Sequence, residues 1–376
     1  MLHNDLCEKL GIEFPIFAFS HCRDVVVAVC KAGGLGVLGA VEMDAEQLDR
    51  ELSIIEAELD GRPYGVDIVI PAKLAVAEEF GDITEEKLRE FIPEDHQSYV
   101  AEVLDAHDVE PLPEGTPRRP GLISWAGDGA SSLVDVALKH DVALIANALG
   151  TPPPDVVDRV HQSGRLVAAL AGKARHARKH VDAGVDIVIA QGYEAGGHTG
   201  EVASMVLIPE IVDEVSPVPV LAAGGIGGGR QMAAAMALGA SGVWCGSVWL
   251  TTQESDSHPV LKEKLLKASS SDTERSRSLT GKPARQIRTE WTEAWNGESG
   301  PNPLEMPLQT ILVVEALQRI DRSAKGPDDG PGRLLGGAVG QIVGRMNTSL
   351  PAGRVVMDMV EEFLEVAESF SDELDH

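Results

Sequence analysis

The fold is decided by Val185-Asp-Ile-Val-Ile-Ala190 and the stretch that follows it at once, Gln191-Gly-Tyr-Glu-Ala-Gly-Gly-His-Thr-Gly200. The first stretch is almost entirely apolar and has the length of one strand, which is typical of a parallel strand covered on both faces. The second is a glycine-rich turn that carries an imidazole, His198. Glycine permits close approach of the backbone to a ligand, and histidine exchanges protons near neutral pH. The pair predicts an active-site loop at the end of a buried strand.

Seven further β-rich runs, with helical stretches between them, extend this pattern along the chain. Together with 185–190, the predicted strands are 15–19, 35–38, 65–70, 142–146, 166–170, 218–222 and 242–245. The predicted helices between them include 24–32, 44–59, 155–163, 173–183 and 229–239. Eight strands alternating with helices predict an α/β fold of the (β/α)8 TIM-barrel type, which often uses about 250 residues.

Two parts of the chain extend beyond a plain barrel. Residues 82–140 are too long for a simple connection and contain the proline-rich turn 111–117, so we interpret them as an insertion. A ninth strand candidate, 122–125, falls inside this insertion; if it belonged to the barrel, one of the other eight runs would have to leave it.

After about residue 255 the β-rich runs stop and helical patterns take over. The predicted helices are 258–268, 285–295, 308–321, 334–347 and 353–370. We therefore predict a barrel domain over 1–255 and a helical second domain over 256–376 that packs at the barrel mouth and ends in a polar tail, 369–376.

The composition is strongly acidic: 59 Asp and Glu against 32 Lys and Arg give a formal net charge of −27. Such a charge repels nucleic acid and anionic lipid, and it opposes folding until salt screens it. We interpret it as adaptation to a salt-rich, halophilic cytoplasm; an ordinary acidic enzyme is the alternative. No run approaches the ~18 apolar residues of a membrane span, and the N-terminus lacks the pattern of a signal peptide, so a cytoplasmic protein is expected.

Four cysteines are present, and their spacing fits neither a Cys-x-x-Cys pair nor a zinc finger. They are Cys7, Cys22, Cys30 and Cys245. We predict buried free thiols, no structural metal and no disulfide framework. Cys22 stands out because it follows a strand end.

Two later turns have the character of phosphate sites. Residues 222–229, Ala-Ala-Gly-Gly-Ile-Gly-Gly-Gly, follow a strand and open a helix, where N–H groups and the helix dipole favour an anion. Gly246 and Ser247 end the next strand. Each turn alone is a weak signal, but loops after the seventh and eighth strands of a barrel commonly hold phosphate. A Rossmann fingerprint fits poorly, because the early glycines 33–36 precede a strand.

Other polar residues admit two interpretations each. His198 and His21 are either catalytic or ordinary turn histidines. Asp67 lies in an apolar strand, where an acid either contacts a ligand or joins a buried network. Asn147 ends the fourth strand and could face the barrel mouth. Residues 280–288 concentrate donor side chains, for which ion pairing to the acidic surface is favoured over a substrate-facing patch.

These motifs resemble those of the nitronate monooxygenases, formerly called 2-nitropropane dioxygenases, which are FMN-dependent TIM-barrel enzymes. The resemblance is carried by 14–16, 32–36, 190–200, 222–229, 246–247 and 279–285. It implies that the FMN phosphate is held by Gly196, Gly197, Gly224, Gly225, Gly246 and Ser247. It also implies that Gln191 reaches the flavin or its ribityl chain, that Ala18 and Phe19 line its ring, and that His198 is the active-site histidine.

The implied reaction is the oxidation of an alkyl nitronate by O₂ to a carbonyl compound and nitrite. His198 would bind the nitronate and, where neutral nitroalkanes are accepted, remove the carbon proton. Two departures concern the substrate: Phe19-Ser-His-Cys22 replaces a Pro-Met type of turn, and Asp67, placed in the cofactor site, stands where asparagine is common. The alternatives are an NAD(P)H-using enoyl reductase of similar fold and a flavin-binding protein without turnover. Assembly into a homo-oligomer is left open.

Overall fold

The computed structural model describes residues 2–41, 43–70, 85–117, 119, 129–298 and 300–374. Its centre is a closed barrel of eight parallel strands in the order β1-β2-β3-β4-β5-β6-β8-β9. Their bounds are β1 (Ile16–Ser20), β2 (Leu35–Gly39), β3 (Gly65–Asp67), β4 (Leu144–Asn147), β5 (Leu166–Ala171), β6 (Ile187–Gln191), β8 (Val220–Ala223) and β9 (Gly242–Cys245). These are the eight predicted strands, so the (β/α)8 fold is confirmed. The ninth candidate, 122–125, lies outside the described residues.

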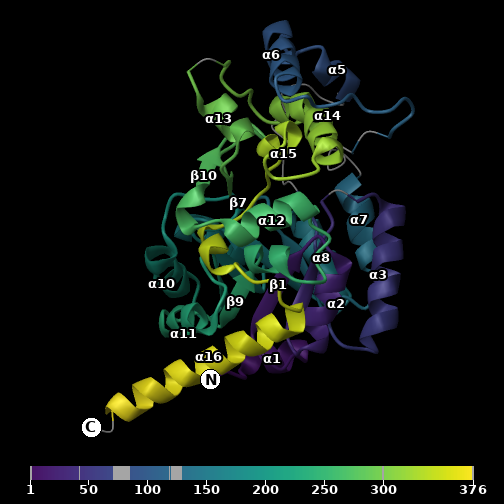
Figure 1. The fold of residues 1–376 in the computed structure, drawn as a ribbon. Helices are drawn as coiled ribbons and strands as arrows, with labels where there is room; N and C mark the ends of the chain where they lie inside the picture. The colour runs from purple at the N-terminus through teal and green to yellow at the C-terminus, as the bar shows by residue number, and fades with distance from the viewer. Residues whose placement is uncertain are drawn as a thin grey trace.

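Helices with one apolar face surround the barrel (Figure 1). They are α2 (Arg23–Lys31), α3 (Ala45–Leu59), α7 (Gly129–Ala137), α8 (Pro154–Gln162), α9 (Ala174–Asp182), α10 (Ser204–Val215) and α11 (Gly229–Ala237). In α3, Asp44 and Gln47 form a capping box at the start, and Leu48 and Leu52 are fully buried on the inner face. Burial of one such leucine contributes roughly 1.5–3 kcal/mol, which explains why this amphipathic sequence lies against the sheet.

The barrel is closed at one end and open at the other. Side chains that point inward, such as Phe17 and Leu35, form one cluster with Leu6 and Leu10 of α1 (Asp5–Leu10). This short helix covers the end of the barrel where the strands begin. The carboxyl ends of the strands therefore form the open mouth, which is where barrel enzymes carry their active sites.

Residues 85–117 of the insertion and much of the C-terminal segment form one helical lobe, seen above the barrel in Figure 1, whereas α7, at the end of the insertion, packs against the barrel. The lobe contains α5 (Glu85–Arg89), α6 (Glu94–Asp105), α13 (Glu290–Asn296), α14 (Leu308–Ser323) and α15 (Gly330–Leu334). Below them, in front of the barrel in Figure 1, α12 (Pro259–Lys267) contributes Val260 to the core of the lobe. Leu104 of α6 shares a buried cluster with Trp295 of α13 and Val313 of α14. Segments far apart in sequence thus share a core, and the boundary near residue 255 remains a prediction.

Of the predicted helices of this region, 334–347 is wrong, and 285–295 is helical only in its second half, as α13. The range 285–295 begins instead with β11 (Ala284–Ile287), which joins β10 (Thr273–Ser276) and β7 (Gly197–His198) in a small antiparallel sheet. The range 334–347 contains only the short 3-10 helix η4 (Gln341–Arg345) and a bridge from Ala338 to Gln286. Its backbone pairs with β11, as in the bond from the N–H of Ile287 to the oxygen of Gly337 (3.1 Å), so tertiary pairing overrides helix propensity.

The last helix, α16 (Ala352–Leu374), leaves the lobe and packs against α11 and α2. Val356, Met359 and Phe363 are buried in the cluster that covers this side of the barrel. The C-terminal end of α16 extends beyond the rest of the molecule (Figure 1). Across the described ranges, no helix combines the length and apolarity needed to cross a membrane.

Candidate active site at the open end of the barrel

The loop after β6 is held over the barrel mouth by the small sheet. Gln191 lies on the inward face of β6, two residues beyond Ile189, and its side-chain amide has no hydrogen-bond partner among the described residues. His198 pairs with Ala284 and Gly197 with Arg285. The predicted active-site loop is therefore fixed in place by a strand that lies about 90 residues further along the chain.

His198 lies on the rim of the mouth. Its residue is exposed, and its Nε2 atom lies 3.3 Å from the hydroxyl of Thr280. Crowding by neighbouring atoms desolvates the imidazole and, together with the positive charge of Lys282, lowers its pKa. The ring is consequently neutral at neutral pH and offers one nitrogen as a proton acceptor.

The segment 280–288 contacts the His198 loop, and its basic side chains form no ion pair within the described ranges of the chain. Neither Lys282, Arg285 nor Arg288 has an ion pair to a described residue, so the favoured ion-pairing interpretation is wrong. Arg285 is 2% exposed and belongs to β11, which directs its guanidinium onto the Tyr193 ring at 4.6 Å. Its Nε also donates to the backbone oxygen of Tyr193 (3.2 Å).

A second guanidinium covers the same tyrosine. Arg275 of β10 is the register partner of Arg285 and lies 5.1 Å from the Tyr193 ring centroid. Its Nη2 donates to the oxygen of Thr199 (3.2 Å), so the two arginines hold both ends of the His198 loop. Such stacking contributes roughly 0.5–2 kcal/mol per contact. The sequence identified the basic patch, but nothing in it signalled Tyr193 as the partner.

The two glycine turns lie after β8 and β9, as predicted. Gly224 and Gly225 have φ values of 101° and 70°, which favour glycine. After β9 comes Gly246, where an added Cβ would lie 3.6 Å from the Phe19 ring of β1. Phe19 in turn stacks with Trp244 at 6.1 Å. The aromatic rings of Phe19 and Trp244 therefore lie next to the two glycine turns at the mouth.

The start of α11, predicted to attract a phosphate, already holds an anion of the protein itself. The carboxylate of Glu362, from α16, accepts hydrogen bonds from the backbone N–H and the Nε of Arg230 (3.3 and 2.8 Å). Burial opposes ionisation of Glu362, but these bonds outweigh it and lower the pKa. The N-terminus of α11 is thus occupied by the carboxylate of Glu362. The turns at Gly224–Gly225 and Gly246–Ser247 remain as candidate positions for a ligand phosphate.

Residues 339–341 close over the His198 loop. The N–H of Gly340 donates to Ser247 Oγ (2.8 Å), and the N–H of Gln341 donates to the oxygen of Glu194 (2.9 Å). A Cβ on Gly196 would lie 2.8 Å from the backbone of Val339, so Gly196 is required for the approach of this segment. Gly197, with a φ of 73°, borders open space, and Ser247 keeps its own O–H to donate. Sequence reasoning missed this segment because it was predicted to be helical.

On the β1 side, one of two predicted lining residues faces the mouth. Phe19 points inward, whereas the methyl group of Ala18 packs outward with Cys22 and Val25. Side chains of a strand alternate between faces, so the two neighbours cannot both line the barrel. The Ala18 side chain therefore does not line the mouth, and contact of Ala18 with the flavin ring through its backbone stays a prediction.

The polar residues of β3 and β4 have different surroundings. Asp67 is 4% exposed and is the last residue of β3, at the open end of the barrel. The side-chain oxygen of Asn147 accepts a hydrogen bond from the backbone N–H of Ile70 (2.9 Å), and its Nδ2 donates one to the backbone oxygen of Ile70 (3.3 Å). Asn147 thus ties the exit of β3 to β4 and does not face the mouth, which corrects the prediction.

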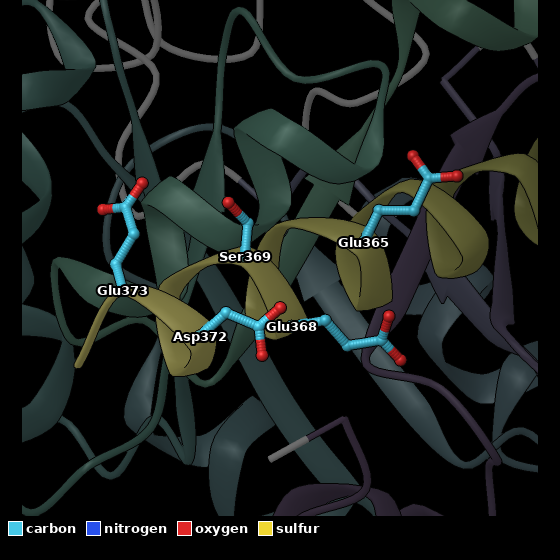
Figure 2. Close-up of a pocket in the computed structure, with 5 residues that line it drawn as sticks. All are labelled: Glu365, Glu368, Ser369, Asp372 and Glu373. Atoms are coloured by element: carbon cyan, nitrogen blue, oxygen red, sulfur yellow. The ribbon is translucent and has the colours of Figure 1, made fainter. Parts of the chain in front are cut away.

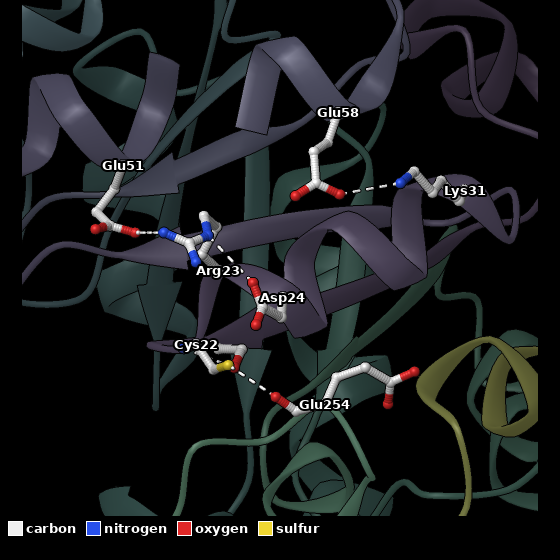
Figure 3. Close-up of polar contacts among 8 residues, drawn as sticks. Cys22, Arg23, Asp24, Lys31, Glu51, Glu58 and Glu254 are labelled. Atoms are coloured by element: carbon white, nitrogen blue, oxygen red, sulfur yellow. Dashed lines mark hydrogen bonds and ion pairs between the residues drawn. The ribbon is translucent and has the colours of Figure 1, made fainter. Parts of the chain in front are cut away.

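The turn after β1 is tied to its neighbours by the contacts in Figure 3. Cys22 Sγ donates to the oxygen of Glu254 (3.1 Å), and burial raises the pKa of this thiol. Arg23 pairs with Glu51 of α3 at 2.8 Å. All four cysteines are buried free thiols, as predicted. Cys22 is therefore a packed structural thiol.

Together, the mouth residues fit a planar ligand that carries a phosphate. Phe19 and Trp244 supply an apolar surface, and Gln191 and Ser247 supply donors. The two left-handed glycines let the backbone approach a phosphate. Among the described residues there is no group of three His, Cys, Asp or Glu side chains placed to hold a metal.

Comparison with known proteins agrees with this geometry. A family model described as nitronate monooxygenase matches residues 4–362. The chain is 54% identical over 364 residues to a protein of Mycobacterium tuberculosis (H37Rv) named "Putative monooxygenase Rv1533", with 96% of each chain covered. Nitroalkane oxidase from Streptomyces ansochromogenes is similar in structure, with a TM-score of 0.78, 27% identity, and coverage of 98% of this chain and 100% of that one. FabK from Thermotoga maritima has a TM-score of 0.74 at 28% identity, with coverage of 99% and 100%. As its loop motifs predict, the chain belongs to the nitronate monooxygenase family.

Proposed function

We propose that this oxidoreductase binds FMN in the barrel mouth and oxidises alkyl nitronates with O₂ to carbonyl compounds and nitrite. The observation that carries the proposal is the placement of His198. A neutral imidazole is held on a fixed loop at the same open end as the two glycine turns and the Phe19 wall. Membership of the nitronate monooxygenase family supports the same chemistry.

Each of these groups has a task that follows from its environment. Lys282 is exposed beside His198, so its charge attracts an anionic nitronate and keeps the imidazole neutral. The neutral ring can accept the carbon proton of a nitroalkane. Ser247 and Gln191 would donate hydrogen bonds to the phosphate and to the polar edge of the cofactor. The chemistry that FMN would supply when bound is that of an electron acceptor for the nitronate and an electron donor for O₂.

The test combines cofactor content with turnover. Purified protein should release FMN on denaturation, consume O₂ with propionate 3-nitronate and produce nitrite. His198→Gln should lower turnover by about 10²–10⁴-fold, the usual contribution of a general base, while FMN affinity stays the same. His3→Gln, at the closed end of the barrel, is the matched control and should be as active as the unmodified protein. A colourless protein that takes up no FMN would contradict the proposal.

The second candidate function is an NAD(P)H-dependent enoyl reductase activity in the same barrel. One observation favours it, namely the similarity over 99% of this chain to FabK from Thermotoga maritima. Anaerobic mixing separates the two, because NADPH alone would bleach the flavin of a reductase, whereas propionate 3-nitronate alone would bleach that of a nitronate oxidase. A protein that holds FMN but responds to neither reagent would be a flavin-binding protein without turnover.

A further inference from the structure

A buried acid lies at the mouth of the barrel, across from the His198 loop. Asp67 is the last residue of β3 and is 4% exposed. A Cβ on Gly65 would lie 3.1 Å from Val37 and 3.4 Å from Leu144, two side chains of the barrel interior. Since side chains two residues apart in a strand point to the same face, Asp67 also points inward, at the level of the open end.

A glycine in β2 makes room for a histidine next to this acid. Gly39 is the register partner of Asp67, and a Cβ on Gly39 would lie 2.7 Å from two ring atoms of His21 and 2.9 Å from Phe19. Neighbouring strands are about 4.8 Å apart, so the His21 ring lies over the strand adjacent to Asp67 and on the same face. Any residue other than glycine at position 39 would displace this ring.

The hydrogen bond of His21 defines which of its nitrogens is free. Nδ1 lies 3.0 Å from the oxygen of Gly39, and because a carbonyl only accepts, Nδ1 carries the proton in this bond. In the neutral ring Nε2 is therefore left as an acceptor. Acid and imidazole at one edge of the mouth are both placed to make polar contacts with a ligand.

Among the residues that the structure describes, the carboxyl group of Asp67 has no charged partner. It makes no hydrogen bond or ion pair with a described residue, and burial raises its pKa to about 7. The strands on either side of Asp67 supply Gly39 from β2 and Ala146 from β4, and His21, from the turn after β1, is the titratable side chain that lies against Gly39. Asn147 is committed to Ile70. A protonated carboxyl group in these surroundings carries an O–H that lacks an acceptor among the described residues.

We propose that Asp67 binds the ligand of the barrel mouth in its protonated form, donating its O–H to a carbonyl oxygen or ring nitrogen of the flavin, and that its ionisation weakens flavin binding. The proposal rests on the proposed function. A neutral acid here would act as a donor, as an amide would, and would place no negative charge beside an anionic substrate. Above neutral pH the donor is lost and a buried charge replaces it.

The experiment measures the Kd of FMN by fluorescence quenching with the full-length apoprotein, from about pH 6 to about pH 8.5. The unmodified protein should bind with a nearly constant Kd up to about pH 7, and the Kd should then rise, approaching tenfold per pH unit, as one proton is lost. Asp67→Asn keeps an N–H donor at every pH and should remove this rise. The phosphate of FMN titrates equally in both proteins, so the ratio of their Kd values isolates Asp67.

Two further measurements distinguish the titration of Asp67 from that of His21 and test the proposal even if the Asp67→Asn variant does not fold. His21→Gln, which removes the other titratable group, should keep the rise in Kd above pH 7. Riboflavin lacks the phosphate, and its binding to the unmodified protein should weaken over the same range, which tests the proposal even if Asp67→Asn fails to fold by circular dichroism. A constant Kd ratio between the unmodified protein and Asp67→Asn, or riboflavin binding that does not change with pH, would overturn this inference while leaving FMN binding intact. Absence of FMN binding at every pH would overturn the proposed function as well.

Discussion

At the scale of single residues, Lys282 tunes the imidazole of His198. Crowding of the ring lowers the pKa of His198, and the charge of Lys282 lowers it further. A histidine with a lowered pKa stays neutral to lower pH, so activity that needs the neutral ring persists further into acid. Lys282→Met should move the acid limb of the kcat/KM profile to higher pH, as determined from initial rates of O₂ uptake. An unshifted limb would mean that another group titrates there; Lys267→Met, remote from the mouth, is the control.

Asp67 also predicts a pH dependence of stability. Its pKa is about 7 in the folded protein and 3.8 as the ordinary value, so between these values the folded state holds a proton that the unfolded state has lost. Stability therefore falls as pH rises through this window, opposite to the usual effect of an acid. Relative to Asp67→Asn, the unmodified apoprotein should lose about 2 to 3 kcal/mol of unfolding free energy between about pH 5 and about pH 8. Urea unfolding curves at both pH values, recorded without flavin, measure this, and parallel curves would contradict it.

Individual residues show where sequence reasoning succeeds. His198 could be assigned to the mouth because it follows a strand end directly, and a parallel barrel brings all such ends together. The side chains of Ala18 and Asn147 point away from the mouth, contrary to expectation. Successive side chains of a strand point to opposite faces, so an error of one residue exchanges the mouth for the outer layer. Tyr193 could not be assigned, because its partners Arg275 and Arg285 are distant in sequence.

At the scale of elements, the contact between residues 339–341 and the His198 loop is close enough to exclude a methyl group. A Cβ on Gly340 would lie 2.7 Å from the oxygen of Glu194 and 3.1 Å from the nitrogen of Gly196. Gly340→Ala should destabilise the protein by roughly 1–3 kcal/mol, the usual cost of overpacking, and weaken FMN binding. Urea unfolding and FMN titration measure the two effects. Gly326→Ala, where nothing lies within 4 Å of the added atom, should change neither.

The elements also show why strands were easier to predict than the C-terminal part. A strand covered on both faces is apolar throughout, and this composition is visible locally. β11 is identified only by its pairing with β10 and β7, and the segment after α15 by its pairing with β11. Such partners come from distant parts of the chain, so a local helical pattern was misleading there.

At the scale of the whole molecule, the net charge of −27 predicts a gain of stability with salt. Screening shortens the Debye length to about 3 Å at 1 M salt, which removes most repulsion between exposed carboxylates. The thermal midpoint should therefore rise between about 0.1 M and about 1 M KCl. The exposed end of α16 supplies a control: Figure 2 shows Glu365, Glu368, Asp372 and Glu373 on one helix. Their replacement by Gln and Asn should reduce the gain, whereas a midpoint independent of salt would contradict the prediction.

The placement of α16 has a consequence for biosynthesis. This helix completes the ring around the barrel between α11 and α2, and its Glu362 satisfies the start of α11. It follows every barrel element in the chain, so the apolar sides of α2 and α11 stay uncovered until residues 352–374 have been synthesised. The closing step of folding must therefore wait for this segment, and a protein cut before residue 352 should depend on chaperones to remain dispersed.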